Sequence, residues 1–364
     1  MFFKFYCLIL KAVFRVGNQP NKITLMQNST PVSQNPLIGI THGDFNGTSY
    51  EIVLKAYADL RLLSIVTPLL YGQSKVFSYY KKNFGMEEFN YSLTRDARQT
   101  WNQKFNILNI VENELKIDPG VPTELSGEMA VKSLKMASDD LRNGFLDALV
   151  LTPANPSTMK SGQYAFSSQM DYLASALGME MPLLMAVSDR LKIGMATSHV
   201  PLGKVSEMIT KDFVMGKLKI LSDTLKNDFG INAPKIAVLG LNPHAGDSGL
   251  FGEEDEKAVK LAVNEVRHKG LYAFGPFAAD TFFLGDAWRK YDAVLAMYHD
   301  QAMLPFNLLS VDAGAYYLAG SQYVCTAPVA GCDFKLCNQN VASPDAFRKA
   351  LYLACDILKH RKGE

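Results

Sequence analysis

Three of the six histidines in the chain stand in the same kind of place, directly after a short apolar run. His199 follows IGMATS, His244 follows IAVLGLNP, and His299 follows AVLAMY. Each run is expected to be a strand, so the imidazoles should lie at the carboxyl edge of a sheet, where open α/β folds hold their ligands. Three neutral imidazoles suit zinc or a related divalent ion and leave a coordination position open for catalysis. We therefore predict one catalytic metal ion held by these three residues.

A histidine at the end of a strand can also do no more than hydrogen-bond a loop, and that interpretation is preferred for any one of the three taken alone. Their matching contexts favour the metal site. Asp247, Asp280 and Asp300 stand in the neighbouring loops, where a carboxylate can orient an imidazole or a substrate hydroxyl, and we assign them as candidate catalytic residues. His268 and His360 stand among lysines and arginines in predicted helices and are expected to be solvated.

The elements that must position these residues alternate between short apolar strands and amphipathic helices. We expect strands at residues 37–41, 65–70, 105–110, 147–153, 191–199, 235–246 and 293–301. We expect helices at residues 49–60, 126–143, 213–229, 253–269 and 344–361. This alternation is typical of an α/β fold in which a mostly parallel sheet is covered by helices on both faces.

The length of 364 residues predicts two α/β domains. The first is expected to span residues 37–165 and 330–364, and the second, residues 166–329, carries the metal histidines. Residues 1–36 are expected to be an extension, because the apolar run over residues 2–14 is too short for a membrane span and residues 27–36 are polar and punctuated by proline. A true start at Met26 and a working export signal remain the two alternatives for this segment, and the first is preferred.

Composition narrows the classes of partner. The formal net charge of +1 offers no electrostatic footprint for nucleic acid or for an anionic membrane, so neither is expected to bind. The five cysteines are an odd number without paired metal-ligand spacing, which suits a reducing compartment and predicts a cytoplasmic protein. A small-molecule substrate is the partner that remains.

Several segments carry a shared pattern: ITHGDFNG at residues 40–47, TSHVPL at 197–202, GLNPHAGDSGLFGEE at 240–254, GPFAADTFF at 275–283 and LAMYHDQ at 295–301. The pattern resembles the 4-hydroxythreonine-4-phosphate dehydrogenase family of pyridoxal phosphate biosynthesis. The resemblance implies a pair of α/β domains related to the isocitrate and isopropylmalate dehydrogenases. It also implies a homodimer in which the three histidines bind a divalent ion (Zn, Mg, Mn or Co) at the shared interface. In the family the ion polarises the substrate hydroxyl as NAD takes a hydride, and the resulting β-keto acid loses carbon dioxide.

The chain departs from the family where the family contacts its substrate. The family's histidine, threonine, lysine, asparagine and arginine are replaced, in that order, by Gln169, Met170, Asn307, Tyr316 and Cys325. Losing the arginine and the lysine removes two positive charges, and each charge-assisted hydrogen bond to a phosphate contributes about 1.5–3 kcal/mol. We therefore predict a changed substrate-binding pocket with little or no turnover of the family substrate. Compensation by Lys160, Arg190 or Lys335 is the alternative.

Two segments that contribute to the cofactor cleft of the family also differ. The family's HGTA motif is replaced by AGCD at residues 330–333, its AGKG-like turn by CNQN at 337–340, and an earlier lysine by Pro156. The residues that bind NAD are therefore not assigned. Three interpretations stay open: a working family enzyme, a member with a changed substrate, and a non-catalytic protein that binds a metal ion or a small molecule.

Overall fold

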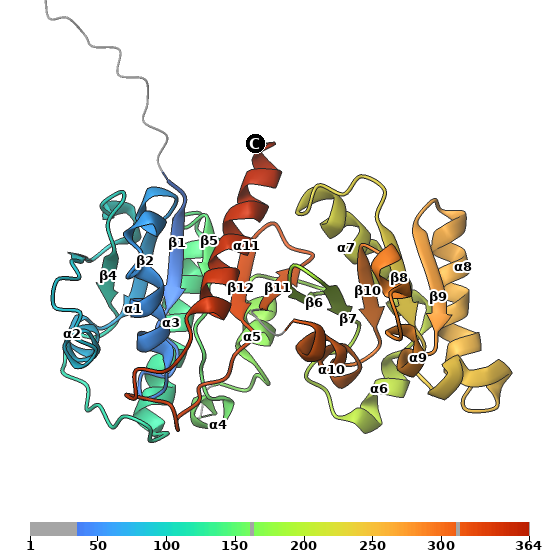
Figure 1. Cartoon of the computed structure of the whole chain (residues 1–364), viewed down its shortest axis with the longest axis horizontal. Helices are drawn as coiled ribbons and strands as arrows, with labels where there is room; N and C mark the ends of the chain where they lie inside the picture. The colour runs from blue at the N-terminus through green and yellow to red at the C-terminus, as the bar shows by residue number, and fades with distance from the viewer. Residues whose placement is uncertain (1–34, 161–163, 311–313, 364) are drawn as a thin grey trace, which may run out of the picture. The chain divides into compact units, whose positions relative to one another are not determined.

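The computed structural model describes residues 35–160, 164–310 and 314–363, and contacts group residues 35–364 into one unit (Figure 1). The extension expected over residues 1–36 lies almost entirely outside the described residues. In the part of the chain that is described, no helix is long and apolar enough to cross a membrane.

The described strands form one twelve-stranded sheet built mainly from two parallel blocks. The first block has the order β3-β4-β2-β1-β5-β12 and the second has the order β7-β10-β8-β9. Between the blocks, β11 and β6 pair antiparallel with each other and with the flanking strands. The strands are β1 (Leu37–Thr41), β2 (Thr67–Gly72), β3 (Ser92–Thr94), β4 (Asn106–Asn109), β5 (Ala148–Val150), β6 (Leu183–Val187), β7 (Lys192–Met195), β8 (Lys235–Leu239), β9 (Tyr272–Phe277), β10 (Ala293–Ala296), β11 (Ala315–Ala319) and β12 (Val324–Pro328).

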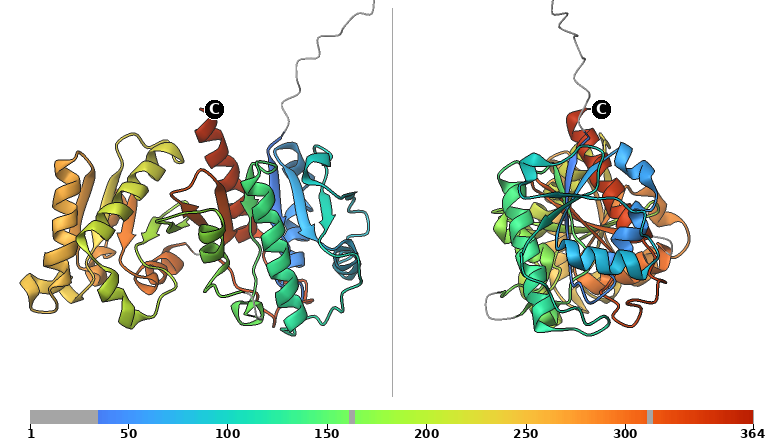
Figure 2. Two further views of the ribbon diagram at one scale, coloured as in Figure 1. Left: turned by 180° about the vertical axis from the view of Figure 1, so that it is seen from behind. Right: turned by 90° about the vertical axis from the view of Figure 1, so that its left-hand side faces the viewer.

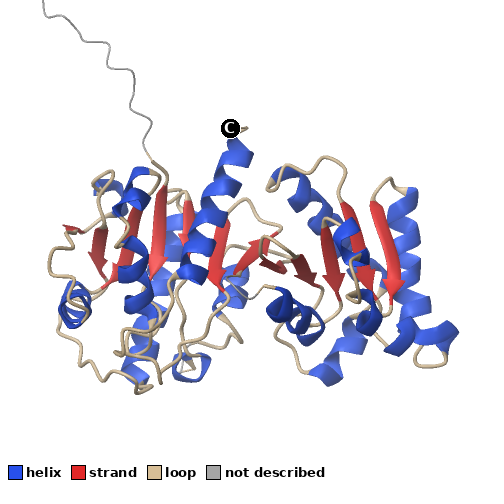
Figure 3. Cartoon of the chain, in the orientation of Figure 1, coloured by secondary structure: helices blue, strands red, loops and turns tan. Residues whose placement is uncertain are grey.

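Helices cover both faces of the sheet (Figures 2 and 3). One face packs against α1 (Ser49–Tyr57), α2 (Ser74–Asn83), α6 (Leu202–Met208), α7 (Lys211–Asn227), α8 (Lys260–His268) and α11 (Asp345–Lys362). The other packs against α3 (Glu124–Arg142), α4 (Pro156–Met159), α5 (Gln169–Ala176), α9 (Ala279–Phe282) and α10 (His299–Leu309). Strand β5 sends Ala148 and Val150 into the first core and Leu149 into the second. Burial on both faces explains why the strands are continuous apolar runs in the sequence.

The mostly parallel α/β fold expected from the sequence is confirmed. Five described strands were not predicted from the sequence: β3, β9 and β12 in the parallel blocks, and β6 and β11, the two antiparallel strands that join the blocks. The sheet continues without a break from the first block to the second, and β12 lies between β5 and β11. The division into domains at residues 165, 166, 329 and 330 stays a prediction.

The strand expected over residues 293–301 is wrong at its carboxyl end. β10 ends at Ala296, and α10 begins at His299. The chain leaves the sheet because Gln301 folds back on the turn: its Oε1 accepts a hydrogen bond from the Met297 amide at 2.7 Å, and its Nε2 donates to the Gly240 carbonyl at 2.7 Å. His299 is therefore the first residue of a helix.

Helix α3 crosses α4 at a contact that only glycine permits. Thr123 and Ser126 form a capping box at the start of α3, which begins two residues earlier than the sequence analysis expected. Gly127 follows, and a Cβ atom at this position would overlap the backbone carbonyl of Thr158. The two helix backbones meet here without an intervening side chain.

We predict that Gly127→Ala lowers the free energy of unfolding by about 2–3 kcal/mol, because overpacking against a backbone atom outweighs the gain of about 1 kcal/mol in helix propensity. Chemical denaturation of the wild type and the variant measures the difference. Gly331→Ala is the matched control, since its Cβ would meet no atom within 4 Å, and its effect should stay within about 0.5 kcal/mol. Equal stability of the Gly127→Ala variant and the wild type would show that α4 moves aside freely.

Candidate metal and substrate site

His244 stands in a strained turn after β8. The segment Pro243–Gly249 contains four non-glycine residues with left-handed backbones, His244, Ala245, Asp247 and Ser248, with φ between 39° and 58°. Each such residue costs about 1–2 kcal/mol, so surrounding contacts must hold the turn.

A buried carboxylate supplies those contacts. Asp255 is fully buried, and it accepts hydrogen bonds from the Leu241 amide at 2.7 Å and from the Asn242 amide at 3.0 Å. It also accepts one from the Asn242 side chain at 3.0 Å. Hydrogen bonds to an ionised acceptor are about twice as strong as neutral ones. Asp255 therefore anchors the residues that lead into the His244 turn.

His199 and His299 lie together because the strands before them are neighbours. β7 and β10 pair in parallel, with Val294 opposite Ile193, and the chain leaves both at the same edge. The two ring centroids are 5.7 Å apart. The pairing of adjacent parallel strands thus decides that these two imidazoles meet.

A carboxylate faces Nδ1 of each of these rings. In His299 the partner is Asp300 Oδ1 at 2.8 Å, and in His199 it is Asp171 Oδ2 at 3.4 Å. A carboxylate in this position favours the tautomer with its proton on Nδ1, which leaves Nε2 free to bind a metal ion. Asp171 was not singled out from the sequence; its position two residues after Gln169 in the family-like SQMD segment was the available signal.

Two cavities adjoin the histidines. One of about 250 Å³ is lined by both His199 and His299, and one of about 520 Å³ is lined by His244 and Asp280. Asp300 lines both cavities, whereas Asp247 lines neither. Within the described residues of a single chain, no three His, Cys, Asp or Glu side chains are grouped to hold a metal ion. One chain therefore brings two of the three predicted ligands together, and the three-histidine site stays a prediction.

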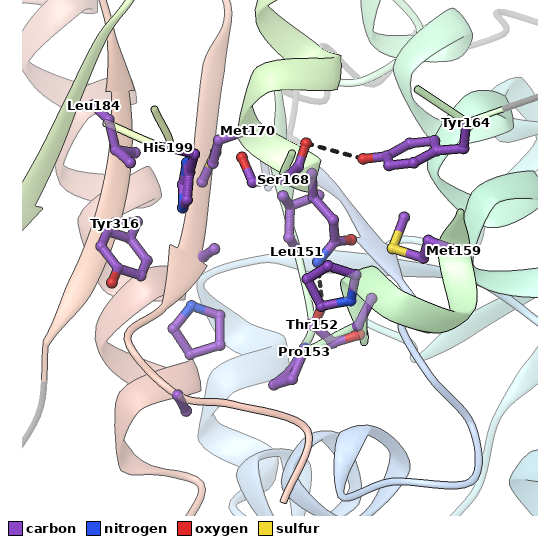
Figure 4. Close-up of a pocket in the computed structure, with 16 residues that line it drawn as sticks. Leu151, Thr152, Pro153, Met159, Tyr164, Ser168, Met170, Leu184, His199 and Tyr316 are labelled. Carbon is purple, nitrogen blue, oxygen red and sulfur yellow. Dashed lines mark hydrogen bonds between the residues drawn. The ribbon is translucent and has the colours of Figure 1, made fainter. Parts of the chain in front are cut away.

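A third cavity, of about 130 Å³, extends from His199 toward β5 (Figure 4). His199, Leu184 and Tyr316 lie on one side of it, and Met159, Tyr164 and Leu151 lie on the other. Gln169 is held at its edge, where its amide nitrogen donates to the Thr152 carbonyl at 3.0 Å. That carbonyl can only accept, so the amide nitrogen of Gln169 faces it. The Oε1 atom of Gln169 is buried and has no hydrogen-bond donor among the described residues.

Comparison with known proteins identifies the family of the chain and agrees with its fold. The family model described as pyridoxal phosphate biosynthetic protein PdxA matches residues 64–354. A 4-hydroxythreonine-4-phosphate dehydrogenase of Bacteroides thetaiotaomicron is 36% identical over 328 residues, which cover 90% of each chain. The chain belongs to the PdxA family. The enzyme of the same name from Sulfurihydrogenibium is 30% identical and covers 89% of this chain and 99% of its own.

A solved structure agrees with these sequence relatives. The 4-hydroxythreonine-4-phosphate dehydrogenase of Burkholderia phymatum superimposes with a TM-score of 0.71 at 28% identity, covering 89% of this chain and 98% of that one. The resemblance seen in the sequence is confirmed, and the chain is a dehydrogenase of the PdxA family. Membership implies NAD and a divalent metal ion as cofactors.

Three of the five positions that depart from the PdxA family pattern line the 130 Å³ cavity, namely Gln169, Met170 and Tyr316. Asn307 is exposed on α10. Cys325 is a residue of β12 and is 1% exposed in the core, where burial raises the pKa of its thiol to about 12. Neither lines the cavity of its own chain, so their role in substrate binding stays a prediction. Lys160, Arg190 and Lys335, the residues considered for compensation, do not line it either. Ala330 and Pro156 do.

The segments related to the cofactor cleft of the PdxA family pack on the HGDFNG loop after β1. The thiol of Cys337 donates to the Gly47 carbonyl of this loop at 3.2 Å. Two residues after the 337–340 segment, the amide of Ala342 donates to the carboxylate of Glu51 in α1 at 2.8 Å. In the loop itself His42 is 1% exposed, and its Nδ1 lies 3.1 Å from the hydroxyl of Tyr50. The C-terminal segment and the first loop are therefore one packed assembly.

We predict that Asp255→Ala lowers the free energy of unfolding by about 3 kcal/mol and weakens metal binding at least tenfold, because it leaves the donors before the His244 turn without their acceptor. Denaturation and metal titration measure the two effects. Glu256→Ala is the control, because this neighbouring carboxylate forms only a surface ion pair with Lys260 and its loss should cost less than about 0.5 kcal/mol. Unchanged metal affinity in Asp255→Ala would contradict the anchoring role.

Stability should also depend on the protonation of His42. Burial lowers the pKa of this imidazole to about 4, from 6.5 in the unfolded chain. Between these values the unfolded state binds more protons, so this contribution to stability is lost as the pH falls, by about 2 kcal/mol between pH 7 and pH 5. Burial raises the pKa of Asp44 and acts in the opposite direction, but it is common to the wild type and to a His42→Phe variant. The pH dependence of the difference between the two proteins isolates His42, and a constant difference would refute the assignment.

Proposed function

We propose that this chain is a metal-dependent, NAD-linked dehydrogenase that oxidises the hydroxyl group of 4-hydroxythreonine-4-phosphate or a related hydroxy acid and releases carbon dioxide. Its relatives carry the name of that substrate. The observation that carries the proposal is the pair His199 and His299, with ring centroids 5.7 Å apart and a carboxylate facing Nδ1 of each. Two oriented imidazoles beside an open cavity supply two of the three protein ligands of a catalytic metal site.

In this proposal His199, His299 and His244 would hold a divalent ion, which would supply Lewis-acid polarisation of the substrate hydroxyl, and bound NAD would supply the hydride acceptor. The residues of the chain hold the reactants in place. Asp171 and Asp300 orient the imidazoles, and Asp280, in the cavity beside His244, is the group available to orient a substrate hydroxyl. Imidazole ligands favour Zn²⁺ or Co²⁺ over Mg²⁺, which prefers oxygen.

We further propose that the site is completed by a second copy of the chain, with His244 of one protomer facing His199 and His299 of its partner. Apolar side chains surround the histidines on the exposed surface: Leu202, Leu250, Leu304 and Leu308 are 72%, 73%, 67% and 77% exposed. α6, α9 and α10 lie at the same end of the second strand block (Figure 1). A large exposed apolar patch at one place marks an interface, and a two-fold axis there exchanges the His244 turns.

The shared site predicts complementation between two variants that each lose the metal ion. His244→Ala and His199→Ala homodimers should hold little metal after dialysis. After subunit exchange, half of the dimers combine the two variants, and each such dimer has one complete site of two. About a quarter of the sites should therefore recover metal and NADH-forming activity. Metal analysis, NAD calorimetry and sedimentation of the same samples measure the recovery.

The control is a mixture of His199→Ala with His299→Ala. Both residues belong to the same half of the proposed site, so no dimer in this mixture has a complete site and no metal should return. Recovery in neither mixture, together with full metal binding by a monomeric wild type, would show that one chain holds the ion alone. A wild type that binds no metal would refute the proposed function.

A further inference from the structure

We infer that the cavity beside His199 accepts a hydroxy acid with an uncharged, apolar tail and disfavours a phosphorylated one. The inference rests on the proposed function, because His199 places the reacting hydroxyl, and it names the part of the substrate that lies in the 130 Å³ cavity.

The first observation is the absence of a counter-charge. Among the described residues with which one chain lines the three cavities around its own histidines, none is lysine or arginine. A phosphate dianion needs several charge-assisted hydrogen bonds to replace its water, and each contributes about 1.5–3 kcal/mol. Without them, moving the dianion out of water costs more than its neutral contacts return.

The second observation is the sign of the charge that is present. Asp171 lies against His199, and its carboxylate acts on the wall residue Tyr164, whose pKa is raised by burial and by this charge. Burial also raises the pKa of Tyr316 on the opposite wall. Both phenols are therefore neutral, and, apart from the metal ion proposed at His199, the charged group that the described residues place at this end of the cavity is the carboxylate of Asp171. The negative carboxylate of Asp171 repels a phosphate group and leaves an uncharged tail unaffected.

The third observation is the shape and chemistry of the walls. They consist mainly of apolar side chains, with Met159, Met170, Leu184 and Leu151 in the two-sided arrangement of Figure 4. An apolar cavity of about 150 Å³ accommodates a molecule as large as benzene, so the 130 Å³ here suits a branched or cyclic group slightly smaller than that. Gln169 also lines the cavity, and its Oε1 is buried without a hydrogen-bond donor among the described residues.

The arrangement also gives the ligand a direction. His199 lines both this cavity and the 250 Å³ cavity that holds His299. A hydroxy acid with its hydroxyl at the two imidazoles therefore has its tail directed toward Met159 and Leu151. The tail, and not the reacting head, meets the apolar walls.

Calorimetry with a matched pair of ligands tests the inference. 4-Hydroxythreonine-4-phosphate and 3-hydroxyleucine share the same 2-amino-3-hydroxy acid head and differ in the tail, which is a phosphate ester in one and an isopropyl group in the other. We expect the metal-loaded full-length protein, saturated with NAD, to bind 3-hydroxyleucine at least tenfold more tightly. Equal or tighter binding of the phosphorylated ligand would overturn the inference.

A change of charge at the rim of the cavity provides the second arm. Ala330 lines the cavity and is exposed, so Ala330→Lys adds a cation without burying it and should tighten binding of the phosphorylated ligand several-fold relative to binding of 3-hydroxyleucine. Asn143→Lys is the matched control: Asn143 is exposed and follows α3 at the amino edge of β5, whereas the cavity lies at the carboxyl edge. Tighter phosphate binding in both variants would indicate a nonspecific charge effect and would count against the inference.

The experiment separates this inference from the proposed function. Metal content and NAD binding are measured first on the same samples. If both are present and the phosphorylated ligand is preferred, only the tail assignment fails. If the protein binds no metal, the proposed function fails, and the preference between the two tails is still measured on the metal-free protein, where the cavity walls are unchanged.

Discussion

The parallel pairing of β7 with β10 is the constraint on which the candidate site depends. Each of the two strands is part of an apolar run. Because they pair in parallel, with Val294 opposite Ile193, the backbone leaves both strands at the same edge of the sheet. The imidazoles of His199 and His299 therefore lie close together as a consequence of this strand pairing. The neighbouring pairing of β10 with β8 brings the His244 turn to the same edge of the sheet, although His244 lines a different cavity from His199 and His299 in the same chain.

Carboxylates set the detailed geometry of this edge. Asp255 anchors the residues that lead into the left-handed His244 turn, and Asp171 and Asp300 face the other two imidazoles. Negative groups of this kind suit a cation among the imidazoles. The same carboxylates repel an anion in the surrounding cavities. No lysine or arginine among the described residues lines these cavities to offset that repulsion. One distribution of charge thus favours a metal ion and disfavours a phosphorylated tail.

The positions that differ from the PdxA family do not contribute equally. Tyr316 and Met170 form walls of the cavity beside His199, so their size and polarity set the shape and polarity of that cavity. Cys325 is buried in the core, where an arginine would need a partner of its own. The change in the pocket is therefore one of packing as much as of lost charge, and single reversions at buried positions would disturb the fold.

The sequence alone determined the α/β class, most of the parallel strands, and the position of three histidines after the ends of strands. Apolar runs of strand length and the residues that follow them are local features of the chain. The strands β3, β9 and β12 were not predicted, nor were β6 and β11, whose antiparallel pairing depends on distant partners. The end of β10 was also missed, because Gln301 folds back onto Gly240, which directly follows β8. Only the tertiary structure decided that Asp171 faces His199, that Asp255 supports His244, and that Gln169 and Tyr316 share a cavity while Cys325 lies in the core. Such contacts join residues far apart in the chain, and neither spacing nor composition records which side chains the packed sheet and helices bring together.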